Sequence, residues 1–424
     1  MTTFDLPPSP TVVGPPSVRR GVRPSPTAVR ARTAGAPPSA RSGAGRAGVA
    51  GRRRGGTVVA HRAPGPSSAY PVLLLVVGIL CMLGLVMVLS ASSIQSLRQY
   101  GSPWHYFERQ VLWLILGSGA FTLAWRVGPV RWRRLAPLAM VATVVLLMAV
   151  LVPGVGMKVA GASRWIGTSS VQIQPSELAK LALIFFAADV MDRRADRGDW
   201  KYQMMPVVVV LVGLVGLVML QPDMGTTMVL ACIALAMVFT AGIPRKPLAG
   251  ILVAGAASFG VMAIAAPYRV RRLTSFLHPL RDMSNTGWQA SQGLAALGNG
   301  RWMGSGLGSS IASWGYLPNA QTDFIFAVIG EELGMVGSIA ITGLFAALAL
   351  VGTRIACRCQ DRYSALLVSG VTAWLVSQAV INIGAVVGLL PVTGVPLPFV
   401  SFGGSSMVIA LFGVGMVAHA ARQP

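Results

Sequence analysis

The chain has 424 residues, of which 54% are hydrophobic and only 11% are charged. A soluble protein carries about a quarter charged residues, so the composition excludes an ordinary soluble domain and indicates an integral membrane protein. The net charge of +22 does not indicate a nucleic-acid partner, because the body of the chain is apolar and the basic tail lacks interleaved aromatic residues.

Residues 1–68 are rich in Pro, Gly, Ala, Ser and Arg and show no apolar periodicity, which is typical of a disordered tail. The first 70 residues hold eleven arginines and one acid, Asp5, so they carry +10 of the net charge. The segment is too long and too polar for a signal peptide. Cations beside a membrane are attracted to an anionic cytoplasmic leaflet by roughly 1 kcal/mol each. We therefore expect a cytoplasmic tail, with anionic membrane lipid and cytoplasmic division proteins as the two partners that its composition leaves open.

Ten apolar segments follow, and each is long enough, or nearly so, for the ~20 residues that a helix needs to cross hydrocarbon. They lie near residues 70–91, 107–126, 134–153, 175–191, 203–220, 223–242, 247–266, 323–353, 363–389 and 396–420. The division between the fifth and sixth rests on Gln221-Pro222, because proline either ends a helix or kinks it. We predict an all-α integral membrane domain over residues 69–424 with about ten transmembrane helices.

Basic residues mark each turn that a cytoplasmic N-terminus places inside the cell, as the positive-inside rule expects. These residues are Arg126, Arg131, Arg133, Arg134, Arg193, Arg194, Arg197, Lys201, Arg245, Lys246, Arg354, Arg358 and Arg362. Ten spans also return the C-terminus to the cytoplasm. Residues 267–322, between the seventh and eighth spans, then form a large extracytoplasmic loop.

This loop combines many cations with a single acid, Asp282. Its arginines are Arg269, Arg271, Arg272, Arg281 and Arg301. They run against the positive-inside trend, which favours a functional role, and many cations around one carboxylate indicate an anionic substrate with one candidate base. Trp288 to Leu297 has helical character and Gly298 begins a turn, so we expect short helices lying on the outer membrane face.

Glu177 and Lys180 are three residues apart at the start of the fourth span, so they share one helix face near the outer boundary. Pro175 suits the first turn of this helix, with Gln174 near its cap. Charges at this depth are costly and normally face a cavity or each other. Two compatible interpretations are open: an ion pair that pins the helix, and a pair that lines a substrate cleft.

Four further polar residues lie beside the starts of spans. Asp223 and Asp323 suit helix caps at the sixth and eighth spans. Arg164 and Trp165 lie just outside the fourth span, where an interfacial anchor is the simple interpretation.

The eighth and tenth spans contain features that are unusual in lipid. Glu331 and Glu332 lie about two turns into a span, so we expect at least one of them to form hydrogen bonds inside the bundle. Residues 395–406 contain two prolines and two glycines, which predicts an irregular or broken helix. Such backbone is tolerated at membrane depth only where it is buried or lines a cavity.

Five blocks of this sequence, in this order, resemble the SEDS family of bacterial polytopic proteins (shape, elongation, division and sporulation). The blocks are Gly161–Lys180, Gln221–Thr227, Asp282–Gly293, Tyr316–Gly334 and Pro396–Ser406. Gly330–Gly334 and the long tail look more like the division branch than the elongation branch. The resemblance implies a peptidoglycan glycosyltransferase of the bacterial cytoplasmic membrane that acts at the division septum. Its substrate would be lipid II, a disaccharide-pentapeptide on undecaprenyl diphosphate, polymerised at the outer face.

The resemblance also implies site residues. The family's essential aspartate lies in the large outer loop after the seventh span, and Asp282 matches it. The reaction needs a base for a sugar 4-hydroxyl, for which a positioned carboxylate is worth roughly 10²–10⁴-fold, and cations for a departing diphosphate. The cations around Asp282 favour its ionised form. The implied substrate-binding residues are Arg164, Trp165, Glu177, Lys180, Arg271, Arg272, Gln289, Asp323 and Ser405.

Four positions depart from the family's pattern. The proline that follows the loop aspartate is Met283 here, and the tyrosine of a Gly-Tyr-Gln segment is Trp288. A frequent histidine before Thr-Asp is Gln321, and a basic residue upstream is Ser313. The missing histidine excludes a histidine base at that point, and the missing cation weakens phosphate binding there, but neither removes Asp282.

Two other functions are open: a transporter that flips lipid II without forming bonds, and a non-enzymatic division scaffold. The unusual polar groups gather near the outer face, which favours chemistry there over a gate at mid-membrane. The implied partners are a class B penicillin-binding protein transpeptidase and other division proteins. The four cysteines and four histidines show no disulfide or metal-site spacing. We therefore expect no resident cofactor, and a divalent cation, magnesium or manganese, only together with the substrate diphosphate.

Overall fold

The computed structural model describes residues 68–159, 162–168, 172–195, 199–244, 249–250, 260, 276 and 287–422. Several sequence predictions fall outside these described residues. They are the disordered tail, most of the span near 247–266, and the first part of the 267–322 loop with Arg271, Arg272, Asp282 and Met283.

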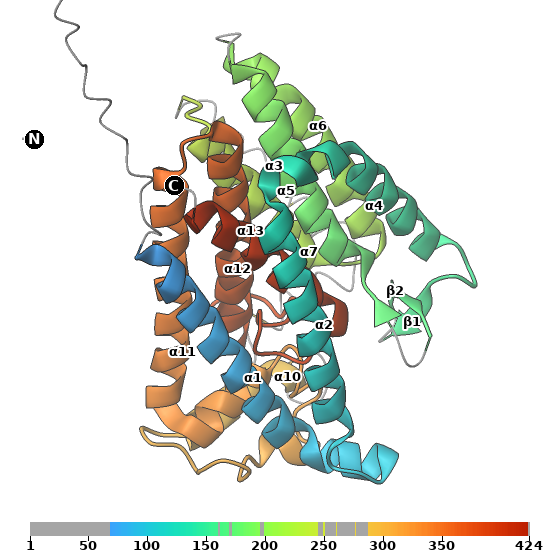
Figure 1. The fold of residues 1–424 in the computed structure, drawn as a ribbon. Coiled ribbons are helices and arrows are strands. Elements are labelled where there is room, and N and C mark those ends of the chain that lie inside the picture. Colours follow the sequence, from blue (N-terminus) through green and yellow to red (C-terminus); the bar gives the residue numbers. More distant parts are fainter. Residues whose placement is uncertain are drawn as a thin grey trace, which may run out of the picture. The chain divides into compact units, whose positions relative to one another are not determined.

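The described chain consists of helices and one small sheet (Figure 1). The helices before the 267–322 loop are α1 (Ala69–Tyr100), α2 (His105–Val127), α3 (Pro129–Trp132), η1 (Arg133–Leu135), α4 (Ala136–Leu151), α5 (Pro175–Arg193), α6 (Trp200–Leu220) and α7 (Met224–Thr240). Within the loop lie α10 (Trp288–Asn299) and η3 (Ala312–Trp314), and after it come α11 (Ile325–Arg358), α12 (Arg362–Val386) and α13 (Gly404–Arg422).

Seven helical segments among the described residues are long and apolar enough to cross a membrane. They are α1, α2, the α3–α4 segment, α6, α11, α12 and α13. The predicted spans at 175–191 and 223–242 are also helices, α5 and α7, although α5 carries several charges and α7 has only 17 residues. The helices α5, α12 and α13 are mostly buried, whereas α2 has only three buried residues, so the core lies around the first three.

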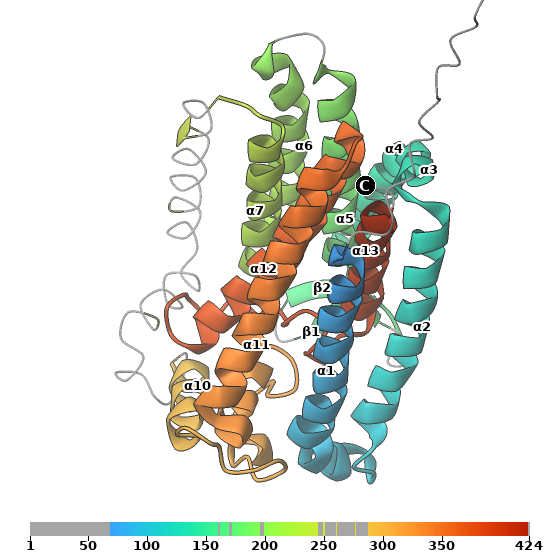
Figure 2. The same cartoon turned by 60° about the vertical axis from the view of Figure 1, so that its left-hand side comes forward.

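The basic helix ends gather on one side of the bundle. Figures 1 and 2 show the beginnings of α1, α6 and α12 at the same end as the last residues of α2, α5, α11 and α13. Arg126, Arg193, Arg358 and Arg362 belong to these helix ends. The loop after α10, residues 300–324, lies at the opposite end (Figure 2). The positive-inside prediction assumed that successive turns lie on alternate sides of the membrane, and this arrangement agrees with it.

Glycines allow α13 to pack closely against α2. A Cβ built on Gly415 would lie 2.4 Å from the carbonyl oxygen of Phe121, and one on Gly117 would lie 2.6 Å from a methyl group of Leu411. Small residues of this kind let two backbones approach in a membrane, where helix association depends on van der Waals packing. The close contact fixes the relative positions of the two helices along their length.

The helix α11 is kinked at Gly334, whose φ of 69° and ψ of −163° lie outside the helical region. The kink breaks the hydrogen bonds that would join Met335 N–H to Glu331 C=O and Val336 N–H to Glu332 C=O. All four groups instead bond to the loop after α10. The Glu331 and Glu332 carbonyls accept from the N–H groups of Ser305 and Gly306, at 2.9 and 3.0 Å. Met335 and Val336 donate to the carbonyls of Arg301 and Trp302, at 2.9 and 3.3 Å. The loop backbone is therefore joined to the helix at its kink.

A three-stranded antiparallel sheet precedes α5 and was not predicted from the sequence. Its strands are β1 (Met157–Val159), β2 (Ala162–Gly167) and β3 (Gln172–Ile173), in the order β1-β2-β3. Only short runs of alternating residues mark these strands, so periodicity gives little signal. The sheet carries Arg164 and Trp165 on β2 and leads directly into the start of α5.

Candidate functional site

The ion pair expected from the sequence is present at the start of α5. Lys180 Nζ lies 2.6 Å from Glu177 Oε1, and the two side chains are only 1% and 2% exposed. Gln174 occupies the N-cap position and Pro175 the first turn, as predicted. Charges this deeply buried must be paired, so the interpretation as an ion pair that pins the helix is confirmed.

Lys180 also joins α5 to α12. Its ammonium donates a hydrogen bond to Gln378 Oε1 at 2.8 Å and lies 5.1 Å from the centre of the Trp374 ring. Trp374 Nε1 donates to the same Gln378 oxygen at 2.8 Å. The amide nitrogen of Gln378 donates in turn to the carbonyl of Pro396, at 2.9 Å. One buried glutamine thus connects the lysine to the irregular segment before α13.

The segment between α12 and α13 is non-helical over residues 391–403, which confirms the predicted irregularity. Asn382 on α12 supports it by donating from Nδ2 to the carbonyls of Val395 and Asp323, each at 2.7 Å. Ser401 accepts from Leu397 N–H at 2.8 Å and donates to the carbonyl of Thr322 at 2.6 Å. These bonds hold the residues before α11 against the residues before α13.

Arg164 projects from β2 to the turn between α6 and α7. Its Nε donates to the carbonyl of Gln221 at 3.0 Å, and its Nη2 donates to the carbonyl of Pro222. Carbonyl groups at a helix C-terminus lack partners within the helix and carry partial negative charge, so the guanidinium satisfies this end of α6. Trp165 follows it in the strand and is half-buried opposite Met157.

Gln221 and Pro222 lie between the end of α6 and the start of α7, as the predicted division between the fifth and sixth spans required. Asp223 caps α7, as predicted: its carboxylate accepts from Thr226 N–H at 3.0 Å and from the Thr226 hydroxyl at 2.7 Å. Gln174 Nε2 reaches the same carboxylate at 3.5 Å. The start of α7 therefore lies beside the start of α5.

Asp323 lies just before α11, whereas Ser405 belongs to α13 and Gln289 to α10. The predicted cap at Asp323 is wrong, because α11 begins at Ile325 and Phe324 occupies its N-cap position. Asp323 instead lies beside the irregular segment, where a Cβ on Gly394 would be 3.5 Å from its Oδ2. Ser405 Oγ accepts from Gln174 N–H at 3.3 Å, so it belongs to the region of Glu177. Gln289 is the second residue of α10, which packs against the start of α11.

Several buried polar atoms around this region have no hydrogen-bond partner among the described residues. They are Ser176 Oγ, Glu177 Oε2, Gln321 Oε1, Asn382 Oδ1 and Thr393 Oγ1. Buried polar groups are normally paired, so these atoms mark where further polar groups are expected. Gln378 and Asn382 were missed by the sequence analysis. Their signal was two amide side chains four residues apart within an apolar span.

Glu331 and Glu332 both form hydrogen bonds, which confirms the expectation that at least one would. The Glu331 carboxylate accepts from the Ser310 hydroxyl at 2.5 Å and from the N–H groups of Ile311 and Ala312, each at 3.2 Å. The Glu332 carboxylate accepts from the Ser90 hydroxyl of α1 at 2.6 Å. The two side chains fasten the loop after α10 to α11 and to α1.

Metal ligation has no support in the part of the chain that the structure describes. No three His, Cys, Asp or Glu side chains lie close enough there to hold a metal ion. Lys180, with its partners Glu177 and Gln378, is instead suited to an anion. These described residues do not fit a resident metal.

A family model described as Cell cycle protein, which covers FtsW, RodA and SpoVE proteins, matches residues 71–424. The chain belongs to this family. A Mycobacterium tuberculosis protein described as a probable peptidoglycan glycosyltransferase FtsW is 40% identical over 358 residues, covering 84% of this chain and 68% of that protein. Stage V sporulation protein E of Bacillus subtilis is 38% identical over 355 residues, covering 83% of this chain and 97% of that protein.

Solved structures confirm the membrane fold. One, described as "Structural coordination of polymerization and crosslinking by a peptidoglycan synthase complex", has a TM-score of 0.69 at 30% identity and covers 82% of this chain and 96% of that chain. The rod shape determining protein RodA of Thermus thermophilus has a TM-score of 0.61 at 28% identity, covering 82% of this chain and 95% of that chain. The resemblance to the SEDS family that was drawn from five sequence blocks is thereby confirmed.

Proposed function

We propose that this SEDS protein is a peptidoglycan glycosyltransferase that joins the disaccharide units of lipid II into glycan strands. The observation that carries the proposal is 40% identity over 84% of the chain to proteins described as probable peptidoglycan glycosyltransferases. The similarity to a chain of a peptidoglycan synthase complex supports the same class of reaction.

In this reaction the oxygen of a sugar 4-hydroxyl forms a bond to the anomeric carbon of the lipid-linked sugar. The bond between that carbon and the diphosphate oxygen breaks, and the diphosphate leaves on its lipid. The hydroxyl proton passes to a carboxylate, and we assign that role to Asp282. The assignment rests on the family match and on its place as the single acid among the loop arginines, since Asp282 lies outside the described residues.

The described residues contribute binding groups. An ammonium has three N–H donors, and Lys180 uses two of them on Glu177 and Gln378. We assign the third to an oxygen of the departing diphosphate, where a fixed positive charge stabilises the charge that develops. The buried polar atoms without described partners, among them Ser176 Oγ and Thr393 Oγ1, are suited to the sugar hydroxyl and amide groups of the substrate.

The setting of the reaction belongs to the same proposal. In this proposal the side of the bundle with the basic helix ends faces the bacterial cytoplasm, and the loop after α10 lies outside, at the division septum; the positive-inside rule supports this orientation. A class B penicillin-binding protein transpeptidase and other division proteins would act beside it, because a new glycan strand has to be cross-linked. The basic tail would contact anionic lipid of the inner leaflet.

The test is polymerisation of purified lipid II by the full chain in detergent, with a transpeptidase partner present. Asp282→Asn, which keeps the size of the side chain, should abolish glycan strands. Asp199→Asn is the matched control, because Asp199 caps α6 by accepting from Lys201 N–H and an asparagine preserves that bond. The control should polymerise like the wild type.

Each other outcome points to a different function. If Asp282→Asn forms polymer at the wild-type rate, the assignment as a glycosyltransferase stands, but Asp282 is not its base. No polymer from the folded wild type would oppose the proposal. In that case, movement of labelled lipid II across vesicles would support a transporter, and its absence would support a scaffold.

A further inference from the structure

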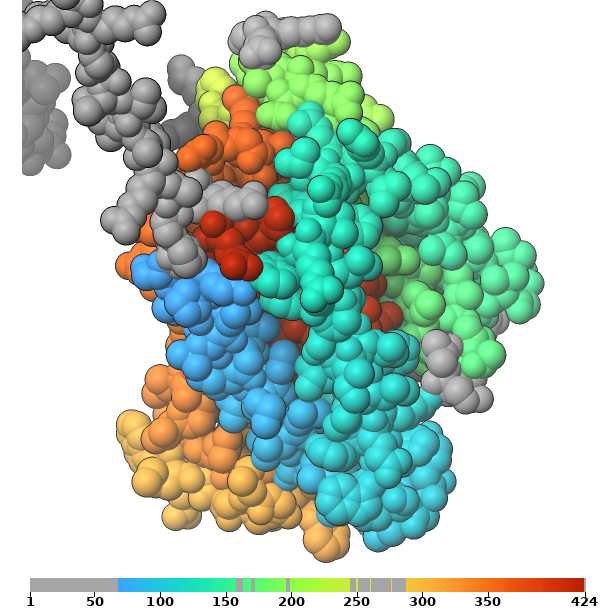
Figure 3. All heavy atoms as spheres, viewed as in Figure 1, coloured from blue at the N-terminus to red at the C-terminus, as the bar shows by residue number. Residues whose placement is uncertain are grey.

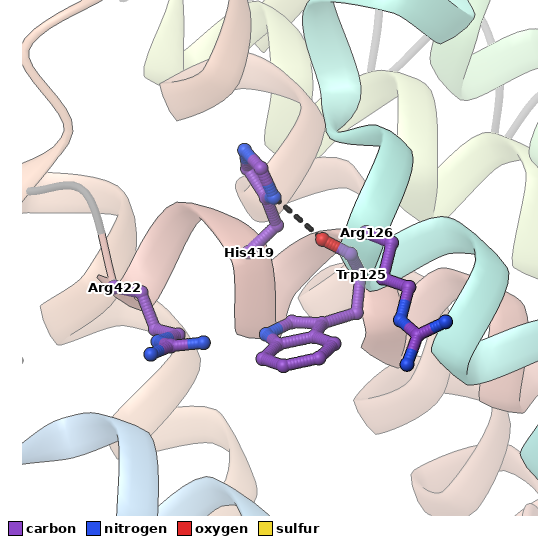
Figure 4. Close-up of a pocket in the computed structure, with 4 residues that line it drawn as sticks. All are labelled: Trp125, Arg126, His419 and Arg422. Carbon is purple, nitrogen blue, oxygen red and sulfur yellow. Dashed lines mark hydrogen bonds between the residues drawn. The ribbon is translucent and has the colours of Figure 1, made fainter.

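A hollow of about 450 Å³ lies at the basic end of the bundle, far along α2 and α13 from Gln174 and Ser405. Trp125 and Arg126 of α2 and His419 and Arg422 of α13 line it (Figure 4). Figure 3 shows the end of α13 reaching the surface between α1 and α2. The lining contains two arginines, one histidine, one tryptophan and no acid.

The orientation of the His419 ring is set by a backbone carbonyl of α2. The carbonyl of Trp125 would accept from residue 129 if α2 continued, but Pro129 has no N–H group. His419 Nδ1 takes this place at 2.6 Å from the carbonyl oxygen. A carbonyl only accepts, so Nδ1 carries the proton and the ring is held in one orientation.

The two arginines lie on opposite sides of the Trp125 indole (Figure 4). The Arg422 guanidinium carbon is 5.0 Å from the centre of the Trp125 ring and 5.7 Å from that of Tyr70. Such stacking orders a guanidinium while leaving its in-plane N–H donors unused. The exposed Arg126 side chain has no hydrogen bond or ion pair among the described residues.

The neighbouring acids do not neutralise this pair. Four described acids lie at the same end of the bundle, and each is engaged elsewhere. Asp189 and Asp192 pair with Arg133, Asp199 caps α6, and Asp361 caps α12. Among the described residues, no carboxylate therefore compensates the positive charge of the hollow.

The surface next to the hollow is apolar. Leu74 lies one turn from Tyr70 on the same face of α1 and is 37% exposed, and Leu123 lies one turn from Arg126 on α2 and is 52% exposed. A ligand that places an anionic group at the arginines would thus find apolar side chains one turn deeper in the bundle.

We propose that this hollow binds the phosphate group of a phospholipid with net negative charge, with Arg126 and Arg422 as its donors and the acyl chains along Leu74 and Leu123. Planar guanidinium groups bind phosphate oxygens through two parallel N–H donors, which suits this pair. The site is separate from the proposed glycosyltransferase chemistry, and neither depends on the other.

The experiment is native mass spectrometry of the purified full chain with dioctanoyl phosphatidylglycerol, dioctanoyl phosphatidylcholine and glycerol 3-phosphate as separate probes. Arg126→Gln should weaken phosphatidylglycerol binding about fivefold, from the value of one cation near a membrane surface. Arg358→Gln is the matched control, because Arg358 is also an exposed arginine in the last turn of a helix at this end. It should change binding less than twofold. The basic tail is present in every variant, so its own lipid binding cancels.

Arg422→Gln removes the second proposed donor. If the loss of this stacked arginine disturbs folding, phosphatidylglycerol binding by Arg126→Gln still tests the proposal. Equal weakening by Arg126→Gln and Arg358→Gln would overturn the proposal, because binding would then follow overall charge. Phosphatidylcholine binding as strongly as phosphatidylglycerol would also overturn it. Glycerol 3-phosphate binding that is lost in Arg126→Gln would support phosphate recognition but assign the site to a soluble ligand.

Discussion

Lys180 Nζ and Gln378 Oε1 lie 2.8 Å apart, although 198 positions separate the two residues in the chain. The bond joins the start of α5 to α12 deep in the bundle, next to the Glu177 carboxylate. Because the lysine serves two buried partners, its removal affects both folding and the proposed binding of diphosphate, and the two effects are separable.

Lys180→Met should destabilise the protein by about 3–5 kcal/mol, because it leaves the Glu177 carboxylate buried without a counter-charge. Thermal unfolding in detergent measures the change. The double variant Glu177→Gln/Lys180→Met removes both charges and should recover most of the stability, yet polymerise no lipid II. A single variant as stable as the wild type would contradict the paired burial.

Glu331→Gln should loosen the loop after α10, because an amide cannot accept all three of the bonds that the carboxylate receives. We expect a loss of about 1–3 kcal/mol in local stability, seen as faster hydrogen exchange at Ile311 and Ala312. Glu108→Gln is the control, since Glu108 is an exposed carboxylate in the first turn of α2. Equal exchange in both variants would oppose a fastening role for Glu331.

Gly415→Ala should destabilise the protein by about 1–3 kcal/mol, because the new Cβ would meet the Phe121 carbonyl at 2.4 Å and Ala124 Cβ at 3.0 Å. Gly119→Ala on the facing helix α2 is the comparison, since nothing lies within 4 Å of its Cβ position. That variant should be neutral or stabilising, as alanine favours helix. Thermal unfolding in detergent measures the stability of both variants. Similar losses of stability in the two would argue against the close α2–α13 contact.

Cys359 follows α11, and burial raises the pKa of its thiol to about 11, with smaller contributions from Asp361 and Cys357. At pH 8 only about 0.1% of this thiol is thiolate, the form that reacts with alkylating agents. In a Cys357→Ser variant, alkylation at Cys359 should accelerate about tenfold per pH unit between pH 8 and 10. Mass spectrometry of the labelled peptide follows the rate. A rate that levels off near pH 9 would mean that the thiol is not buried.

Much of this architecture was predictable because its signals are local. Pro175 marks the start of α5, Gln221-Pro222 separates α6 from α7, and Asp223 caps α7 through its own neighbours. The spacing of Glu177 and Lys180 likewise predicts an ion pair on one face. These features need no knowledge of distant residues.

The remaining features depend on contacts between distant segments. The partnership of Lys180 with Gln378, and of Asn382 with the Asp323 carbonyl, follows from helix packing that no local pattern encodes. The sheet that carries Arg164 has strands too short for periodicity to detect. Asp282, the predicted base, lies outside the described residues and remains a prediction.

The exchange of hydrogen bonds at Gly334 has a mechanical consequence. The backbone of residues 301–306 forms the hydrogen bonds that α11 lacks at its kink. The first turns of α11 and the loop are therefore expected to move together. A force on the loop therefore acts within the first third of α11, and bending concentrates at Gly334. The hinge of this region thus lies inside a segment that hydropathy presents as one uninterrupted span.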